Sequence, residues 1–450
     1  MFLAADRPSE PVESVQQLVD YFAAAAKPRA EWRVGTEHEM IGVYAADGSA
    51  PPYEGGRGIA AIFERFAAAG WRPVHEGETV IALMCAGGQM TFEPGGQLEH
   101  AVRPLDHTDE LVAAVERNVA IVADVSSRLG IAWLSIGFRP FGRLEDVPWM
   151  PKRRYEVMRS YLPTRAPLPH EMMKRTATVQ VNLDYADAED ALEKMRCMMS
   201  VTSLMTAIYA NSPIVDGALT DYQSYRARVW LDTDPDRCGL LPFVFEDGDP
   251  FRGYAEWALD VPMFFVYRGG DYRPAGGMTF RRFMREGFGG ERATLDDWAL
   301  HLSTLFPEAR LKTYLEVRGC DAGSFEMNAA LGALSRGLFY DADARRAAIE
   351  LTAGLSFAER LALLRAVPQS GLATPVGATG RTAGDLARDL CAIAEDGLGR
   401  LDATEIPHLA PVRAIVESRR TQADQAADAY RAAAGSPAAL IRELAYPGLG

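Results

Sequence analysis

Two glutamates separated by one residue lie in residues 32–44. This segment is rich in β-branched and aromatic residues, which predicts a strand. Side chains two positions apart on a strand project from one face, so Glu37 and Glu39 should point together while His38 points away. Two carboxylates on one face repel each other unless a cation or a basic residue lies between them. Without cysteine ligands or a HExxH helix, this pattern favours a hard cation, Mg²⁺ or Mn²⁺.

Two other segments add carboxylates with the same possibilities. The turn at residues 94–96, Pro-Gly-Gly, separates Glu93 from Glu99 and would bring both toward one cavity. In residues 313–319, Glu316 and Arg318 share a strand face, which suits either a phosphate-handling site or an ordinary ion pair. A hard cation shares its oxygen ligands with phosphates, so these carboxylates predict a metal-nucleotide site.

Amide and guanidinium groups recur at the same spacing. Gln180 and Asn182 would share one face of a strand, either as site-lining groups or as solvated residues. Residues 225–231 alternate polar and apolar positions, which predicts a strand with Arg226 and Arg228 on one face. The planar guanidinium fork can hold a carboxylate or a phosphate through two hydrogen bonds, and a surface salt-bridge strand is the alternative.

The elements that would position these residues do not alternate regularly between strand and helix. This order favours an α+β fold with a curved, mostly antiparallel sheet and surrounding helices. We expect one catalytic unit over residues 1–450, with a strand-rich core over about 30–330 and a helical part over about 332–450. Strands are expected at 32–44, 79–84, 89–101, 131–138, 176–185, 225–231, 263–268 and 313–319, and helices at 14–22, 106–129 and 191–210.

Composition excludes several functions. The chain has 450 residues and a formal net charge of −14, with no long basic run, so nucleic acid is an unsuitable partner. No GxxxxGK[ST] loop, GxGxxG turn or GxSxG elbow is present. No apolar run is long enough to span a bilayer, and the first residues lack a leader pattern, so we expect a cytoplasmic protein without a membrane partner.

The motifs, taken in order, resemble the plant and proteobacterial type of glutamate-cysteine ligase, a glutamine-synthetase-like carboxylate-amine ligase. The likeness runs from about residue 30 to about residue 320. The motifs are WRVGTEHE (32–39), TFEPGGQLE (91–99), IGFRP (136–140), MPKRRYEVMRSYLP (150–163), TATVQVNLDY (176–185), ANSP (210–213), RVWLDTDPDRCGLLPFVF (228–245), ALDVPM (258–263), MTFRRF (278–283) and LFPEARLKTYLEVRGCD (305–321).

The resemblance implies a glutamine-synthetase-like sheet and an ATP-dependent reaction. The γ-carboxylate of glutamate would take the terminal phosphoryl group, and the cysteine amine would attack the acyl phosphate to give γ-glutamylcysteine, the first step of glutathione biosynthesis. Glutamate, cysteine and ATP would be the substrates, and the chain would be a monomer or a weak homodimer. Plant members use cysteine pairs as switches, and the matching helix (109–118) has no Cys here, so plant-like disulfide activation is not expected.

The resemblance also assigns roles by position. Arg318 would neutralise charge on the transferring phosphoryl group. The residues that would bind substrates are Gln180, Asn182, Arg226 and Arg159. The residues that would hold Mg²⁺ are Glu37, Glu39, Glu93, Glu99 and Glu316.

Three other functions stay open from the sequence. A γ-glutamyl ligase that uses a different amine would carry the same glutamates. A metal-dependent amide hydrolase would use clustered carboxylates to activate water and would turn over without ATP. A catalytically silent nucleotide-binding relative is disfavoured because all five glutamates and Arg318 are retained.

Overall fold

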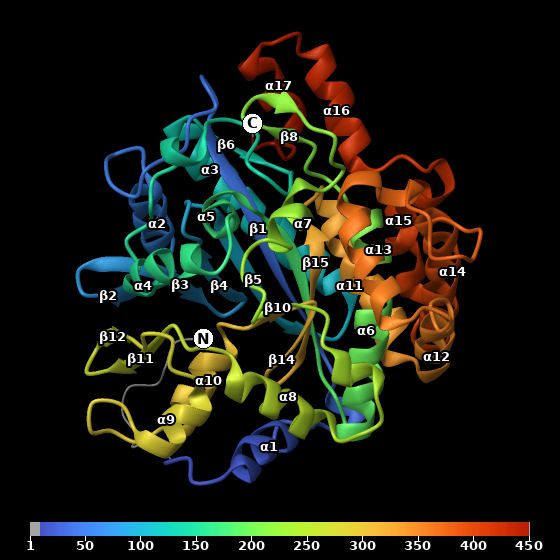
Figure 1. Cartoon of the computed structure of the whole chain (residues 1–450). Coiled ribbons are helices and arrows are strands. Elements are labelled where there is room, and N and C mark those ends of the chain that lie inside the picture. The colour runs from blue at the N-terminus through green and yellow to red at the C-terminus, as the bar shows by residue number, and fades with distance from the viewer. Residues whose placement is uncertain (1–9, 450) are drawn as a thin grey trace.

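A computed structural model describes residues 10–449, apart from the side chain of Asn118. Its centre is a nine-stranded sheet in which every neighbouring pair is antiparallel (Figure 1). The α+β class with an antiparallel sheet is therefore confirmed. The strands run in the order β14 (Ala309–Leu311), β15 (Leu315–Asp321), β7 (Thr178–Leu183), β1 (Val34–Tyr44), β5 (Leu98–Leu105), β4 (Gly88–Phe92), β3 (Thr79–Cys85) and β2 (Arg72–Glu76), and β6 (Ile131–Leu134) also pairs with β1.

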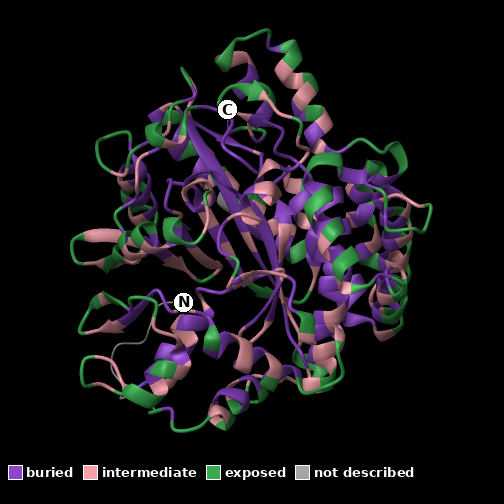
Figure 2. Ribbon diagram, viewed as in Figure 1, coloured by how far each residue is buried: buried purple, intermediate pink, exposed green. Residues whose placement is uncertain are grey.

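Helices cover one face of this sheet. Helices α6 (Ala188–Ile208) and α11 (Phe325–Tyr340) pack on β15 and β7, and most of their residues are buried (Figure 2). The remaining helices are α1 (Val15–Ala23), α2 (Ile59–Ala68), α3 (Thr108–Leu129), α4 (Arg153–Tyr161), α5 (Pro169–Arg175), α7 (Tyr225–Trp230), α8 (Pro250–Asp260), α9 (Phe280–Glu286), α10 (Leu295–Leu302), α12 (Ala342–Glu350), α13 (Phe357–Ser370), α14 (Ala383–Leu401), α15 (Ala410–Ser418), α16 (Gln422–Ala432) and α17 (Pro437–Leu444).

The two faces of β1 carry different chemistry. His38 points toward the covering helices, where its Nε2 lies 2.7 Å from the Tyr446 hydroxyl and 2.8 Å from Asn328 Nδ2. Burial is the main cause that lowers the pKa of His38 to about 3, so this ring is a neutral core group. The expected opposition between His38 and its glutamate neighbours is confirmed.

The strand predicted at residues 225–231 is wrong. These residues form helix α7, which begins at the N-cap Ser224, whose side chain accepts a hydrogen bond from the backbone N–H of Ala227. Burial recurs at Arg226 and Val229, which is the three-residue spacing of a helix. Arg226 and Arg228 therefore lie on different faces, and Arg228 pairs with Asp232 at 2.5 Å.

The other predicted elements agree with the structure. The predicted first helix is α1, and its N-cap Ser14 forms the reciprocal hydrogen bonds of a capping box. Among the described residues, all strands end at or before Asp321, and the later elements are helical. No helix in residues 10–449 has the length and apolarity that a membrane span requires.

Candidate active site

The strand register brings the predicted polar residues onto the face of the sheet opposite to His38. Glu39 on β1 lies opposite Glu99 on β5, and Glu37 lies opposite Gln180 on β7. Asn182, two residues further along β7, donates a 3.0 Å hydrogen bond to Glu37 Oε1. Same-face spacing in the sequence therefore located these side chains correctly.

Glu93 reaches the same face through a glycine turn between β4 and β5. Gly96 has φ of +81°, a left-handed conformation that favours glycine. A Cβ on Gly95 would lie 2.0 Å from the carbonyl oxygen of Lys174, so the turn has no room for a side chain there. The predicted convergence of Glu93 and Glu99 is confirmed, since both line one cavity.

This main cavity has a volume of about 670 Å³. Its acidic wall is formed by the four-glutamate cluster, which we define as Glu37, Glu39, Glu93 and Glu99.

Burial, and after it mutual repulsion, opposes ionisation of two glutamates in this wall. Burial, together with the charges of Glu93 and Glu37, raises the pKa of Glu99 to about 8. Burial and the neighbouring carboxylates Glu93 and Glu99 raise the pKa of Glu39 well above its ordinary value. The cluster is thus a set of carboxylates that lacks enough positive charge to keep all of them ionised.

Lysine and tyrosine groups border the acidic wall. Lys152 Nζ donates a 2.6 Å hydrogen bond to the Phe92 carbonyl and also bonds Thr91. Burial, which outweighs the attraction of Glu93 and Glu99, lowers the pKa of Lys152 to about 8. Tyr155 donates to the Phe92 carbonyl at 2.8 Å. The Lys152 ammonium beside the glutamates therefore loses its proton more readily than an ordinary lysine.

A basic part of the cavity lining lies two strands from β1 in the same sheet, on and beside β14 and β15. Glu316 is fully buried, and its two oxygens accept hydrogen bonds from Arg310 at 2.7 Å and from Arg318 at 2.6 Å. Lys312 Nζ lies 3.4 Å from Glu316. Burial alone would raise the pKa of Glu316, but the three cations outweigh this effect and hold that pKa well below its ordinary value. Glu316 is thus already neutralised, unlike the four-glutamate cluster.

Replacing Glu316 by glutamine should destabilise the folded protein. The change leaves three partly or fully buried cations without their shared anion, a loss of about 3 kcal/mol. Urea unfolding, followed by circular dichroism, measures the effect. The exposed Glu246→Gln variant is the matched control, and equal urea midpoints for both variants would contradict the ion-pair network.

A buried carboxylate positions the first substrate-binding candidate, Arg226. Asp321, at the end of β15, accepts hydrogen bonds from Ser212 at 2.6 Å and from Ser224 at 2.8 Å. Arg226 Nη1 lies 3.8 Å from Asp321, and its Nη2 donates to the Arg318 carbonyl at 2.9 Å. Arg226 is only 3% exposed and lines the main cavity. It reaches this cavity from helix α7 and not from the predicted strand.

Arg159 lies outside the main cavity, and its role in substrate binding stays a prediction. It is exposed near the end of α4, where its guanidinium stacks 4.7 Å from the Trp149 ring centroid. It does not line the main cavity, whereas Arg154 on the same helix does. Arg154 and Arg159 are five residues apart, about 140° around the helix axis, so they lie on different faces of α4.

The geometry suits a hydrated hard cation. The four-glutamate cluster offers only oxygen ligands, and a bound cation would offset the burial and the repulsion that raise the pKa values of Glu39 and Glu99. In residues 10–449, the only three ligand-type groups within 4.8 Å of one another are His107, Asp402 and Glu405, outside the main cavity. The four-glutamate cluster does not bring three carboxylate oxygens within 4.8 Å of one another. A cation held there would therefore take its remaining ligands from water or phosphate.

Comparison with known proteins decides which family this site belongs to. A model of glutamate-cysteine ligase family 2 matches residues 33–443. The chain belongs to glutamate-cysteine ligase family 2. The chloroplastic glutamate-cysteine ligase of Brassica juncea is 39% identical over 436 residues, which cover 96% of this chain and 84% of that protein. The chloroplastic glutamate-cysteine ligase B of Oryza sativa subsp. japonica is 40% identical over 441 residues, 95% of this chain and 87% of that protein.

A solved structure supports the fold of the ligase. The glutamate-cysteine ligase of Francisella tularensis, solved in complex with AMP, has a TM-score of 0.57. It is 12% identical, and the match covers 92% of this chain and 87% of that chain. The sheet of this ligase is thus shared with a distant enzyme, and the resemblance read from the motifs is confirmed.

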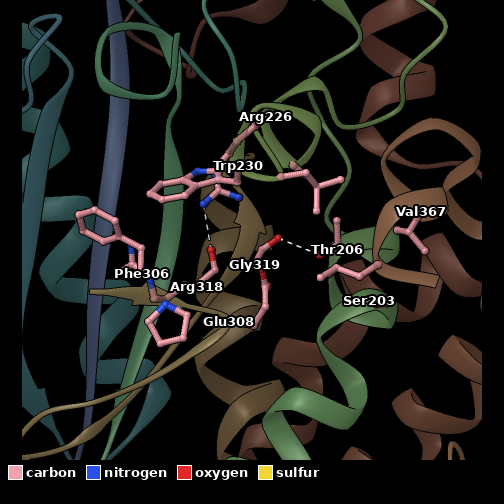
Figure 3. Close-up of a pocket in the computed structure, with 13 residues that line it drawn as sticks. Ser203, Thr206, Arg226, Trp230, Phe306, Glu308, Arg318, Gly319 and Val367 are labelled. Atoms are coloured by element: carbon pink, nitrogen blue, oxygen red, sulfur yellow. Dashed lines mark hydrogen bonds between the residues drawn. The ribbon is translucent and has the colours of Figure 1, made fainter. Parts of the chain in front are cut away.

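Sequence reasoning missed several residues of the ligase's cavity. Lys152 and Tyr155 are three apart at the start of α4, a helical spacing that the sequence did display. Arg310 and Lys312 precede Glu316 at alternate positions, which was also a legible strand signal. Glu308, which lines a smaller neighbouring cavity (Figure 3), had no signal, because its neighbours come from α6 and from a strand bulge.

Proposed function

We propose that this glutamate-cysteine ligase uses the four-glutamate cluster to hold Mg²⁺ with the phosphates of ATP. The enzyme joins the γ-carboxylate of glutamate to the amine of cysteine and makes γ-glutamylcysteine. The observation that carries the proposal is the convergence of four glutamates on one wall of the main cavity, where Glu39 lies opposite Glu99 in the sheet register. Burial and the neighbouring carboxylates raise the pKa of Glu99, so a bound cation would stabilise its ionised form. The bound cation would screen the polyphosphate from the acidic wall, which explains how a chain of net charge −14 accepts ATP.

Arg318 is the proposed catalytic residue. Its Nη1 is held by Gln180 Oε1 at 2.8 Å and by Glu316 at 2.6 Å. Two fixed acceptors orient the guanidinium toward the cavity, where it stabilises charge on the phosphoryl group that passes to glutamate. Arg310 and Arg318 occupy both carboxylate oxygens of Glu316, so Glu316 could bind a cation only if one of these arginines moved away. The four-glutamate cluster is therefore the core of the proposed metal site.

Substrate omission tests this function. The ligase should release ADP only when Mg²⁺, glutamate and cysteine are all present, with γ-glutamylcysteine identified by mass spectrometry. ADP release that is equally fast without cysteine, with no dipeptide formed, would refute it. A panel of other amines tests the alternative acceptor, and turnover without ATP would favour a hydrolase.

We also propose that the protein is cytoplasmic and is a monomer or a weak homodimer. Size-exclusion chromatography tests the oligomeric state.

The stability of the cation-free enzyme should fall as the pH rises from about 4.5 to about 8. Folded Glu99 keeps its proton up to about pH 8, whereas the unfolded side chain releases it near 4.5. The folded state therefore binds more protons across this interval, and the free energy of unfolding decreases with pH. Differential scanning fluorimetry at pH 6.0 and 8.5 measures the change. The Glu99→Gln variant should show a flatter profile, and an identical profile would contradict the assignment.

A further inference from the structure

A buried polar layer lies behind the four-glutamate cluster, on the face of the sheet that carries His38. His38 stands between Glu37 and Glu39 on β1, and His100 follows Glu99 on β5. The two histidines pair across the strands, and each is only 3% exposed. Because side chains alternate along a strand, the facing of these histidines and the facing of the glutamates are fixed together.

Tyr446 supplies a hydroxyl group to this polar layer. Its side chain is buried, and its ring stacks on Phe325 with 4.3 Å between the ring centroids. The hydroxyl lies 2.7 Å from His38 Nε2 and 2.8 Å from the carbonyl oxygen of Gly323. Gly323 closely follows β15, the strand of Arg318. One hydroxyl therefore contacts both β1, which carries two glutamates of the cluster, and the segment after β15.

Backbone hydrogen bonds hold the segment that carries Tyr446. Ala445 forms an antiparallel bridge with Leu134 on β6. The Tyr446 N–H donates to the Trp133 carbonyl at 2.9 Å, and the Trp133 N–H donates to the Leu449 carbonyl at 3.0 Å. Strand β6 in turn pairs with β1. The Tyr446 ring is therefore placed by its own backbone and does not depend on its hydroxyl to stay in the core.

A buried polar side chain restricts the arrangements that a strand can adopt. A shift of β1 by one residue would turn His38 toward the main cavity and would turn Glu37 and Glu39 into the core. His38 is stable in the core only where partners satisfy its ring, and Nε2 has two, the Tyr446 hydroxyl and Asn328 Nδ2. These contacts favour the placement of β1 in which both glutamates face the cavity.

We propose that Tyr446 is a positioning residue for the cation site of this ligase. It does not line the main cavity, and it acts through His38 on the strand that carries Glu37 and Glu39. The proposal rests on the proposed function, because it takes the four-glutamate cluster as the site of the cation. It adds a residue outside the cavity on which the alignment of that cluster depends.

Tyr446→Phe tests the proposal, because it keeps the ring on Phe325 and removes only the hydroxyl. Binding of Mn²⁺ with a non-hydrolysable ATP analogue, followed by electron paramagnetic resonance, should weaken by about 3- to 10-fold, an effect within the range of substitutions that do not touch the ligand. The KM for Mg²⁺-ATP should rise, while the KM for cysteine should stay within twofold. Asn328→Ala, which removes the other partner of His38 Nε2, should weaken binding in the same way.

Tyr185→Phe is the matched control. Tyr185 is fully buried, and its hydroxyl donates a 2.7 Å hydrogen bond to the Phe22 carbonyl on α1, away from the main cavity. Each tyrosine variant loses one buried hydroxyl, so both should lower the thermal midpoint by a similar amount, about 1–3 °C. Only Tyr446→Phe should weaken the Mn²⁺–nucleotide complex.

The outcomes separate this proposal from the proposed function. If wild type binds no Mn²⁺–nucleotide complex, the proposed function itself fails. If wild type binds the complex and Tyr446→Phe binds it as tightly as wild type does, the positioning role is refuted. An equal loss of affinity in Tyr446→Phe and Tyr185→Phe would show that affinity follows stability alone, and it would also refute the role. A loss confined to Tyr446→Phe and Asn328→Ala supports it.

Discussion

Replacing Arg318 by lysine should lower kcat by about 100- to 1,000-fold. Lysine keeps the positive charge but lacks the planar guanidinium, in which Nη1 alone donates to both Gln180 and Glu316. A single ammonium would have to serve both acceptors and the phosphoryl group. The ammonium would be free to move, so charge developing on the phosphoryl group would lose its fixed donor. Steady-state ADP release at saturating substrates measures kcat. The KM values for glutamate and cysteine should change much less.

Arg228→Lys is the matched control for this variant. Arg228 lies two residues from Arg226 on α7 but pairs with Asp232, away from the main cavity. It should retain the activity of wild type. A kcat within threefold of wild type for Arg318→Lys would show that Arg318 only balances Glu316, and the catalytic assignment would fall.

Replacing Glu39 by glutamine should reduce activity and stabilise the cation-free protein at the same time. The amide removes one proposed ligand of Mg²⁺, so kcat/KM for Mg²⁺-ATP should fall by at least about 100-fold. It also removes a carboxylate that is buried against Glu93 and Glu99, so the thermal midpoint should rise by about 1–3 °C. A substitution of equal size that lowers activity but raises stability is expected where buried carboxylates bind the ligand and destabilise the protein in its absence.

Glu316→Gln provides the contrast for that variant. Both glutamates lie on the same face of the sheet, but Glu316 is surrounded by three cations and Glu39 by carboxylates. The two substitutions should therefore shift stability in opposite directions. A thermal midpoint that falls for Glu39→Gln as much as for Glu316→Gln would contradict the description of the four-glutamate cluster as self-repelling.

The part of the site that depends on strand period was predictable from sequence. Same-face spacing placed Glu37 with Glu39, and the register then set Glu99 and Gln180 opposite them. The glycine turn gave the convergence of Glu93 because a left-handed residue at 96 fixes the chain reversal locally. Such local rules need no knowledge of distant segments.

The rest of the site depends on tertiary contacts that no local pattern carries. Arg226 seemed to lie on a strand because six residues are too few to separate a period of 2 from one of 3.6. Its position follows from Asp321, about a hundred residues away, which holds the N-cap Ser224. Glu308 acquires its partner Thr202 only when α6 packs against the β15 bulge. Long-range packing of this kind overrides local alternation.

Binding of Mn²⁺ together with a non-hydrolysable ATP analogue tests the central claim most directly. Electron paramagnetic resonance titration should show a bound Mn²⁺–nucleotide complex in wild type and in Arg228→Lys. A Glu39→Gln/Glu99→Gln double variant should bind it at least about 100-fold more weakly. Equal affinity in the double variant and wild type would contradict the claim that the four-glutamate cluster holds the cation.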